Sequence, residues 1–69
     1  MSVPSIQVNG EALALEREVT LGELLTLLGV PREGSAVALN DAVVSKGRID
    51  AQPVRPGDRI EIIRAVAGG

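Results

Sequence analysis

Residues 19–31, VTLGELLTLLGVP, predict the helix around which the fold is built. Thr20 and Glu23 have the spacing of a capping box, in which each side chain accepts a hydrogen bond from the backbone amide of the other residue. Leucines recur at i, i+3, i+4 and i+7 and form one apolar stripe: Leu21, Leu24, Leu25 and Leu28. Gly29, followed by a proline, ends the helix. Gly22 in the first turn costs about 1 kcal/mol relative to alanine, so the helix depends on packing against another element.

Residues 4–16, which precede the helix, predict a β-hairpin. Apolar residues alternate with polar ones on both sides of Asn9 and Gly10. This dipeptide favours the type I′ turn because it tolerates positive φ at both central positions. The alternation places four side chains on the inner face of the hairpin: Ile6, Val8, Leu13 and Leu15.

Two further strands are expected directly after the helix. Residues 36–39 are a short apolar run, which predicts a strand buried between two neighbours. Residues 43–44, beyond a turn at residues 40–41, predict its short partner. Residues 45–54 have no regular pattern, and they contain two isolated apolar anchors: Ile49 and Val54.

A turn at residues 56–58 leads into the last strand, in which residues 59–62 alternate between polar and apolar. One helix covers only one face of such a sheet. Placing the last strand parallel to the first, with the helix in the crossover, gives both strands a neighbour. The predicted fold is therefore α+β, a ubiquitin-like β-grasp in which one helix packs on a mixed four- to five-stranded sheet.

The chain ends in two glycines, Gly68 and Gly69. They predict a flexible tail over residues 67–69, beyond a β-grasp domain of residues 1–66. A terminal carboxylate is a poor electrophile, so joining it to sulfur or nitrogen requires a mixed anhydride with AMP, formed in another protein. Residues without Cβ atoms pass a narrow channel and adopt whatever φ it demands. We therefore expect Ala67, Gly68 and Gly69 to enter a partner's active site, with Gly69 as the reacting residue. The alternative is that the glycines merely fray or are a remnant of expression.

The outer face of the predicted sheet, which the helix does not cover, carries an apolar patch. If Ile60 faces the helix, alternation directs Ile63 away from it. Ala36 and Ala38 share that outer face. An open sheet face is normally polar, so these three residues predict a docking surface for the activating enzyme. The alternative is that the patch packs beneath residues 45–54.

The composition excludes most enzyme chemistries. The chain has no Cys, His, Phe, Tyr or Trp, which rules out a disulfide scaffold, a thiolate or imidazole metal site, a triad with His and an aromatic platform for bases. The formal charge is −2 and the seven Arg and Lys residues are scattered, so nucleic acid is not an expected partner. No signal-peptide pattern or apolar run of about 18 residues is present, so we expect a cytoplasmic protein that does not bind membranes.

Two other polar features have structural interpretations. Asp41 and Asp58 lie beside turns and lack further oxygen donors, so they are expected to be turn residues rather than metal ligands. The Lys46-Gly47-Arg48 segment is too short for a phosphate-binding loop, and the sequence assigns it no role.

The sequence resembles the ThiS family of sulfur carriers over nearly its whole length. Four stretches carry the resemblance: IQVNGE at residues 6–11, VTLGELL at 19–25, VALN at 37–40 and PGDRIEIIRAVAGG at 56–69. The last stretch is the most specific. Carriers of this family tend to have a proline, a basic residue and an aromatic after the fourth strand. This chain has SKGR at residues 45–48 instead, a departure that concerns local packing more than the chemistry of the tail.

The resemblance implies a carrier with no catalytic residue, metal or cofactor of its own. It implies that an E1-like enzyme adenylates Gly69 with Mg-ATP. It further implies that a sulfur donor system, such as a cysteine desulfurase, converts the adenylate to a thiocarboxylate. Thiazole synthase then receives the sulfur for the thiazole moiety of thiamine. The carrier is expected to be a monomer when free.

Other functions fit the same fold. The small subunit of molybdopterin synthase and the ubiquitin-like carriers for tRNA thiolation or protein conjugation share the terminal glycines. A β-grasp interaction module that is never activated belongs to a different class, and it has no need for a terminal Gly-Gly.

Overall fold

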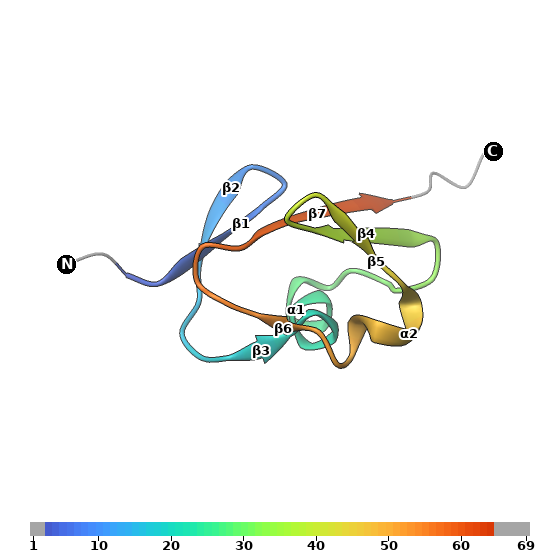
Figure 1. The fold of residues 1–69 in the computed structure, drawn as a ribbon, viewed down its shortest axis with the longest axis horizontal. Coiled ribbons are helices and arrows are strands. Elements are labelled where there is room, and N and C mark those ends of the chain that lie inside the picture. Colours follow the sequence, from blue (N-terminus) through green and yellow to red (C-terminus); the bar gives the residue numbers. More distant parts are fainter. Residues whose placement is uncertain (1–2, 65–69) are drawn as a thin grey trace.

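The computed structural model describes residues 3–64, which form a five-stranded mixed sheet packed against one principal helix (Figure 1). The elements in chain order are β1 Ser5–Val8, β2 Glu11–Ala14, β3 Val19–Thr20, α1 Leu21–Leu28, β4 Ser35–Leu39, β5 Ala42–Val44, α2 Lys46–Ile49, β6 Pro53–Val54 and β7 Arg59–Arg64. The strands of the large sheet are ordered β2-β1-β7-β4-β5. Within residues 3–64 no helix has the length and apolar character needed to cross a bilayer.

The last strand, β7, lies in the centre of the sheet. It pairs in parallel with β1, where Val8 lies opposite Ile60, and antiparallel with β4, where Val37 lies opposite Ile62. The parallel neighbour comes from the other end of the chain, and α1 lies in the crossover between them. This topology confirms the predicted ubiquitin-like β-grasp.

Both hairpins of the sheet close through turns with left-handed backbone conformations. In the first, φ is 51° at Asn9 and 84° at Gly10, as expected for a type I′ turn. In the second, φ is 50° at Asn40 and 72° at Asp41. Asn and Asp are the non-glycine residues that adopt this conformation most readily, so both turns use residues suited to the twist of the flanking strands.

Helix α1 has the predicted cap at each end. The Thr20 amide donates to Glu23 Oε1 over 3.0 Å, and the Glu23 amide donates to Thr20 Oγ1 over 3.1 Å. Gly29 ends the helix with φ of 71°. The apolar stripe is confirmed at three of its four leucines, because Leu28 is 38% exposed. Leu28 occupies the last turn, at the mouth of a groove that no other element fills.

The core between α1 and the sheet is entirely aliphatic. Its buried residues are Ile6, Leu15, Val19, Leu21, Leu24, Leu25, Val37, Ile49, Val54 and Ile60. Val8 and Leu13 share the predicted inner face of the first hairpin but are only partly buried. They lie next to the turn of the hairpin, so the burial of this face is incomplete near its tip.

The segment over residues 45–54 is more ordered than its sequence pattern predicts. It contains α2, and it ends in β6, which pairs with β3 in a second, two-stranded sheet. Ile49 and Val54 are 2% and 0% exposed, which confirms them as anchors. A two-residue strand has too few positions to show alternation, and its partner lies far away in the sequence, so β3 and β6 were missed.

Candidate functional site

The outer face of the sheet brings together the three residues of the predicted docking patch. In the antiparallel register of β4 and β7, Ala36 lies opposite Ile63 and Ala38 lies opposite Glu61. Ile63 is 62% exposed, whereas Ile60 on the other face is 1% exposed. The alternative in which residues 45–54 cover the patch is wrong, because their anchors belong to the core on the helix side.

A fourth apolar residue extends this patch and was missed in the sequence. Val43 of β5 lies opposite Ala38 and is 80% exposed. Its neighbour Val44 packs against the core, so alternation directs Val43 outward. The signal was present in the sequence, where two adjacent valines cannot both face the core of a sheet. We call Ala36, Ala38, Val43 and Ile63 the outer patch.

The two hairpin turns fix the position of β7, and thereby of the patch. Asn9 Oδ1 accepts a hydrogen bond of 2.8 Å from the amide of Ile62, beyond the last residue of β1. Asn40 Oδ1 accepts one of 2.9 Å from the amide of Arg59, at the other edge of β7. Each asparagine therefore supplies β7 with a partner at the point where a neighbouring strand has turned away.

A further turn delivers the chain into β7. Asp58 Oδ2 accepts a hydrogen bond of 2.8 Å from the amide of Arg55, and its Oδ1 accepts one of 3.1 Å from Asn40 Nδ2. Gly57 has φ of 89°, and the Asp58 amide donates to the Arg55 carbonyl. Asp41 forms an ion pair of 2.6 Å with Arg59. Both aspartates are thus turn residues, as predicted, and residues 3–64 contain no group of three or more acidic, His or Cys side chains that would hold a metal ion.

An exposed ion pair lies directly over Gly22 in the first turn of α1. Arg32 forms two contacts with Asp50, of 2.7 Å from Nη1 to Oδ2 and 2.6 Å from Nη2 to Oδ1. The hydrogen bond from Arg32 holds the pKa of the Asp50 carboxyl below its ordinary value of 3.8, and the same bond raises the pKa of Arg32. A Cβ atom on Gly22 would collide with the Asp50 carboxylate, so glycine lets this pair close over the first turn of the helix.

The remaining predicted site residues form the tail, and they lie outside the described residues. These are Ala67, Gly68 and Gly69, together with the predicted domain boundary at residue 66. The structure describes β7 up to Arg64, directly after Ile63 of the outer patch. The Lys46-Gly47-Arg48 segment belongs to α2.

Comparisons with known proteins agree with this architecture. The ThiS family matches residues 6–69. The sulfur carrier protein ThiS of Thermus thermophilus is 36% identical over 64 residues, which are 93% of this chain and 98% of that protein. A thiazole synthase of Magnetococcus marinus is 41% identical over 64 residues, and the chain spans only 20% of its length.

A solved structure shows the same fold. The crystal structure of the thiamine biosynthesis protein ThiS from Geobacter metallireducens superimposes with a TM-score of 0.82 at 31% identity, covering 94% of this chain and 99% of that one. A family match over nearly the whole chain and a structure of this similarity lead to the same assignment. The chain belongs to the ThiS family, the ubiquitin-like sulfur carriers of thiamine biosynthesis.

Proposed function

We propose that this protein carries sulfur as a thiocarboxylate on Gly69 and delivers it for the thiazole moiety of thiamine. The observation that carries the proposal is that the ThiS family match runs through Gly69 itself. The composition supports it as well, because the chain contains no Cys or His that would supply a nucleophile or a general base. In this proposal the reacting group is the carboxylate of Gly69, and the catalysts are partner proteins.

Two steps convert this carboxylate to a sulfur donor. An E1-like enzyme joins the Gly69 carboxylate to the AMP portion of Mg-ATP, which releases pyrophosphate and leaves a mixed anhydride. Sulfide then attacks the carbonyl carbon, and AMP departs with the electron pair of the broken C–O bond. The sulfide comes from a sulfur donor system, such as a cysteine desulfurase whose persulfide is reduced by a thiol. The product is the thiocarboxylate. Mg-ATP is a substrate of the activating enzyme, and in this proposal the carrier itself binds neither Mg²⁺ nor ATP.

Thiazole synthase is the proposed acceptor of this sulfur. The Magnetococcus marinus thiazole synthase contains a stretch similar to this chain within a much longer protein. A carrier and an acceptor joined in one polypeptide work at a high effective concentration of each other.

The outer patch is the proposed docking surface for the activating enzyme. Ile63 is the most prominent apolar side chain of β7 on the open face, at 62% exposure. Only a few residues separate it from Gly69, and three extended residues span at most about 10 to 11 Å. An enzyme that covers the outer patch therefore has its nucleotide site within reach of the tail.

Intact-mass spectrometry tests the proposal. The protein is incubated with its activating enzyme, Mg-ATP and sulfide, and we expect a gain equal to the mass difference between sulfur and oxygen. Gly69→Ala and a variant that lacks Gly69 should melt like the parent, yet form the thiocarboxylate far more slowly or not at all. Normal thiocarboxylate formation without Gly69 would overturn the assignment of the reacting carbon. No mass gain in the parent would favour a β-grasp module that is never activated.

A further inference from the structure

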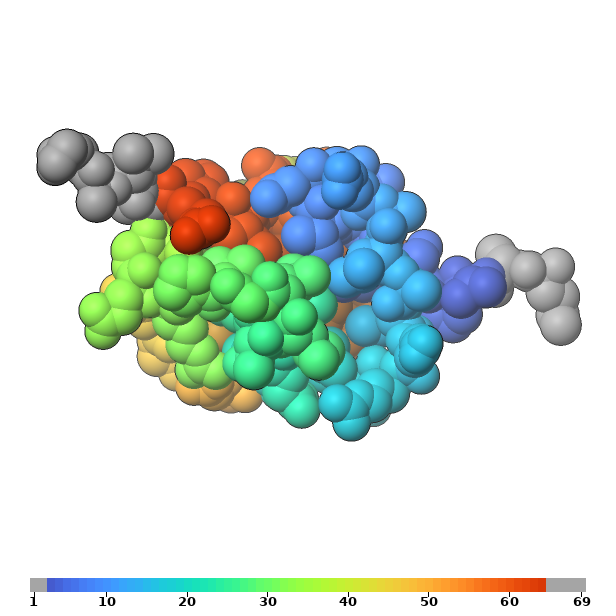
Figure 2. Space-filling view, turned by 180° about the vertical axis from the view of Figure 1, so that it is seen from behind, coloured from blue at the N-terminus to red at the C-terminus, as the bar shows by residue number. Residues whose placement is uncertain are grey.

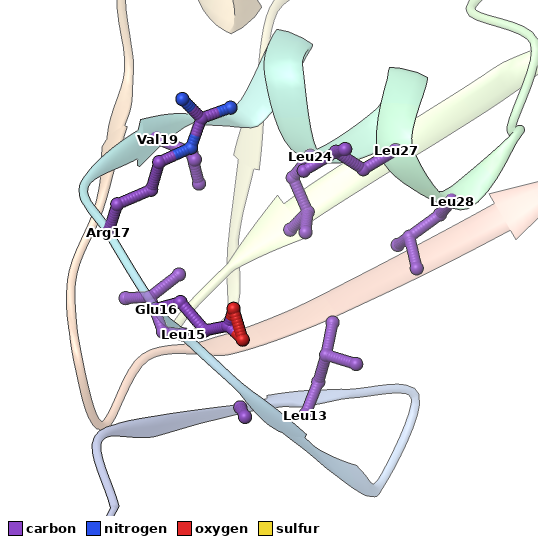
Figure 3. A pocket seen from close by; sticks show the side chains of 9 residues that line it. Leu13, Leu15, Glu16, Arg17, Val19, Leu24, Leu27 and Leu28 are labelled. Atoms are coloured by element: carbon purple, nitrogen blue, oxygen red, sulfur yellow. The ribbon is translucent and has the colours of Figure 1, made fainter.

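A second apolar surface lies on the helix side of the sheet, between the first hairpin and α1. It is a groove of about 370 Å³, lined mainly by Leu13, Leu15, Val19, Leu24, Leu27 and Leu28. The hairpin and α1 share one face of the molecule (Figure 2), and Leu13 points across the groove toward Leu28 (Figure 3). Leu27 and Leu28 are 66% and 38% exposed. The outer patch lies on the opposite face of the sheet, so the proposed carrier chemistry does not use this groove.

The groove runs beside an open strand edge. β2 is the last strand on its side of the sheet. Val8 and Glu11 flank the two-residue turn as a hydrogen-bonded pair, and the Leu15 amide donates to the Pro4 carbonyl over 2.9 Å. Hydrogen-bonded and non-hydrogen-bonded pairs alternate in an antiparallel ladder. The N–H and C=O groups of Ala12 and Ala14 therefore point away from β1, toward the open edge.

The edge and the groove together match an added strand. A strand paired with Ala12 and Ala14 would lie about 4.8 Å from β2, and every second side chain would point to the helix side. On that side lies the groove with Leu13 and Leu27. Main-chain bonds would set the position of the segment, and alternate apolar side chains would fill the groove.

The charges around the groove favour a cationic segment. Glu16 and Arg17 line the groove itself, and the neighbouring Glu11 and Glu18 bring residues 11–18 to three carboxylates against one guanidinium. The ion pairs among residues 3–64 use other side chains. The last turn of α1 has no basic residue to offset the negative end of its dipole. Glu11 lies on the same face of β2 as Leu13, by alternation.

We propose that this groove binds an extended segment of a partner protein, in which apolar residues alternate and a lysine or arginine flanks them. The segment adds to β2 as a sixth strand of the sheet. The outer patch lies on the opposite face of the sheet and stays free, so a protein held by this groove can still be bound there. The proposal does not rest on the sulfur-carrier function.

A peptide titration tests the groove directly. The ¹⁵N-labelled protein is titrated with the capped peptide KTVIVTK up to about 1 mM and followed by NMR. We expect shifts concentrated at the amides of Ala12, Ala14, Leu27 and Leu28, with slower hydrogen exchange at the two alanines. The peptide KTVPVTK lacks one main-chain donor and should bind at least fivefold more weakly. ETVIVTE should bind at least threefold more weakly because its flanking charges are reversed.

A pair of matched variants separates the groove from other apolar surfaces. Leu27→Lys should weaken binding of KTVIVTK at least tenfold, whereas Val43→Lys, the same change on the outer patch, should leave it within twofold. Both side chains are exposed in the parent, and the same spectra verify that each variant is folded. Absence of shifts at β2, or equal binding of the proline peptide, would overturn the proposal. Concentration-dependent shifts at β2 without peptide would overturn it in favour of a second copy of the chain.

Discussion

Each face of β7 carries an isoleucine, but one of the two is buried and the other is exposed. Ile60 lies opposite Val8 and Leu39 and is 1% exposed, whereas Ile63 lies opposite Ala36 and is 62% exposed. Burying an isoleucine contributes about 1.5 to 3 kcal/mol to folding, and Ile63 forgoes most of that gain. The helix-facing side of the strand therefore supports stability, and the open side is available for binding. The first three predictions below test that division, and the fourth concerns a charged pair outside β7.

The largest expected effect concerns the covered face. Leu25→Ala removes a leucine of α1 that is 1% exposed, and it should lower the free energy of unfolding by about 2 to 5 kcal/mol. Leu27→Ala, on the same helix but 66% exposed, should change it by less than about 0.5 kcal/mol. Urea unfolding followed by circular dichroism measures both, since the chain has no Trp or Tyr. Equal effects would mean that the assignment of helix faces is wrong.

A smaller effect concerns the turn that fixes which face each side chain occupies. Asn40→Ala loses the hydrogen bonds to Arg59 and Asp58 and forces alanine into a φ of 50°. We expect a loss of about 2 to 4 kcal/mol, because each of the two bonds contributes about 0.5 to 1.5 kcal/mol and the left-handed conformation adds about 1 kcal/mol. Asn40→Gly relieves only the backbone strain, so its melting midpoint should fall between those of the parent and Asn40→Ala. If the melting midpoint of Asn40→Gly equals that of the parent, the side-chain hydrogen bonds of Asn40 contribute nothing to stability.

The open face is tested by Ile63→Asp. This change should leave the melting midpoint nearly unchanged, yet weaken binding to the activating enzyme at least tenfold, which is about 1.4 kcal/mol or more. Val3→Asp, at a side chain that is 67% exposed and outside the outer patch, serves as the matched control in the same calorimetric titration. Unchanged affinity in folded Ile63→Asp would remove the outer patch from the interface. Loss of folding would show that Ile63 belongs to the core.

The smallest expected effect is a pH dependence from the Arg32–Asp50 pair. The pKa of Asp50 is lowered in the folded protein by its hydrogen bond to Arg32. A carboxylate of this kind stabilises the fold above its unfolded pKa, and the contribution is lost as the pH falls through the lower, folded value. NMR titration of the Asp50 carboxyl carbon should show a pKa below 3.8, and Arg32→Gln should move it upward. Arg64→Gln should leave the titration unchanged; an equal shift there would indicate a general charge effect.

The sequence predicts most of the sheet and the helix because their signals are local. The capping box, the two asparagine turns and the alternation at residues 59–62 each occupy a few adjacent positions, and all were found. β3 and β6 were missed because two residues cannot show a period and their pairing joins distant parts of the chain. The exposure of Leu28 was missed for a related reason, since helical spacing defines a face without telling how far the neighbouring sheet extends.

The candidate site also has features that local patterns predict and features that depend on distant contacts. Alternation alone placed Ala36, Ala38 and Ile63 on one face, and the register confirms that they are neighbours. Asn9 was predicted as a turn residue, but its bond to Ile62 spans 53 positions in the chain, and no local pattern encodes it. Gly22 was predicted only as a costly residue within the helix, and the ion pair that lies over it joins residues 18 positions apart. Sequence patterns thus specify faces and turns, whereas contacts between turns and strands require the fold.

The central position of β7 ties the folding of the large sheet to the synthesis of its last strand. Hairpins β1–β2 and β4–β5 join neighbouring segments and can form early, but in the large sheet they are connected only through β7. Among residues 3–64, β7 is the last strand to be synthesised, so Ile6 and Val37 have no common core until it emerges. A chain terminated early would lack both its central strand and Gly69. Such a product would unfold, and proteases would remove it.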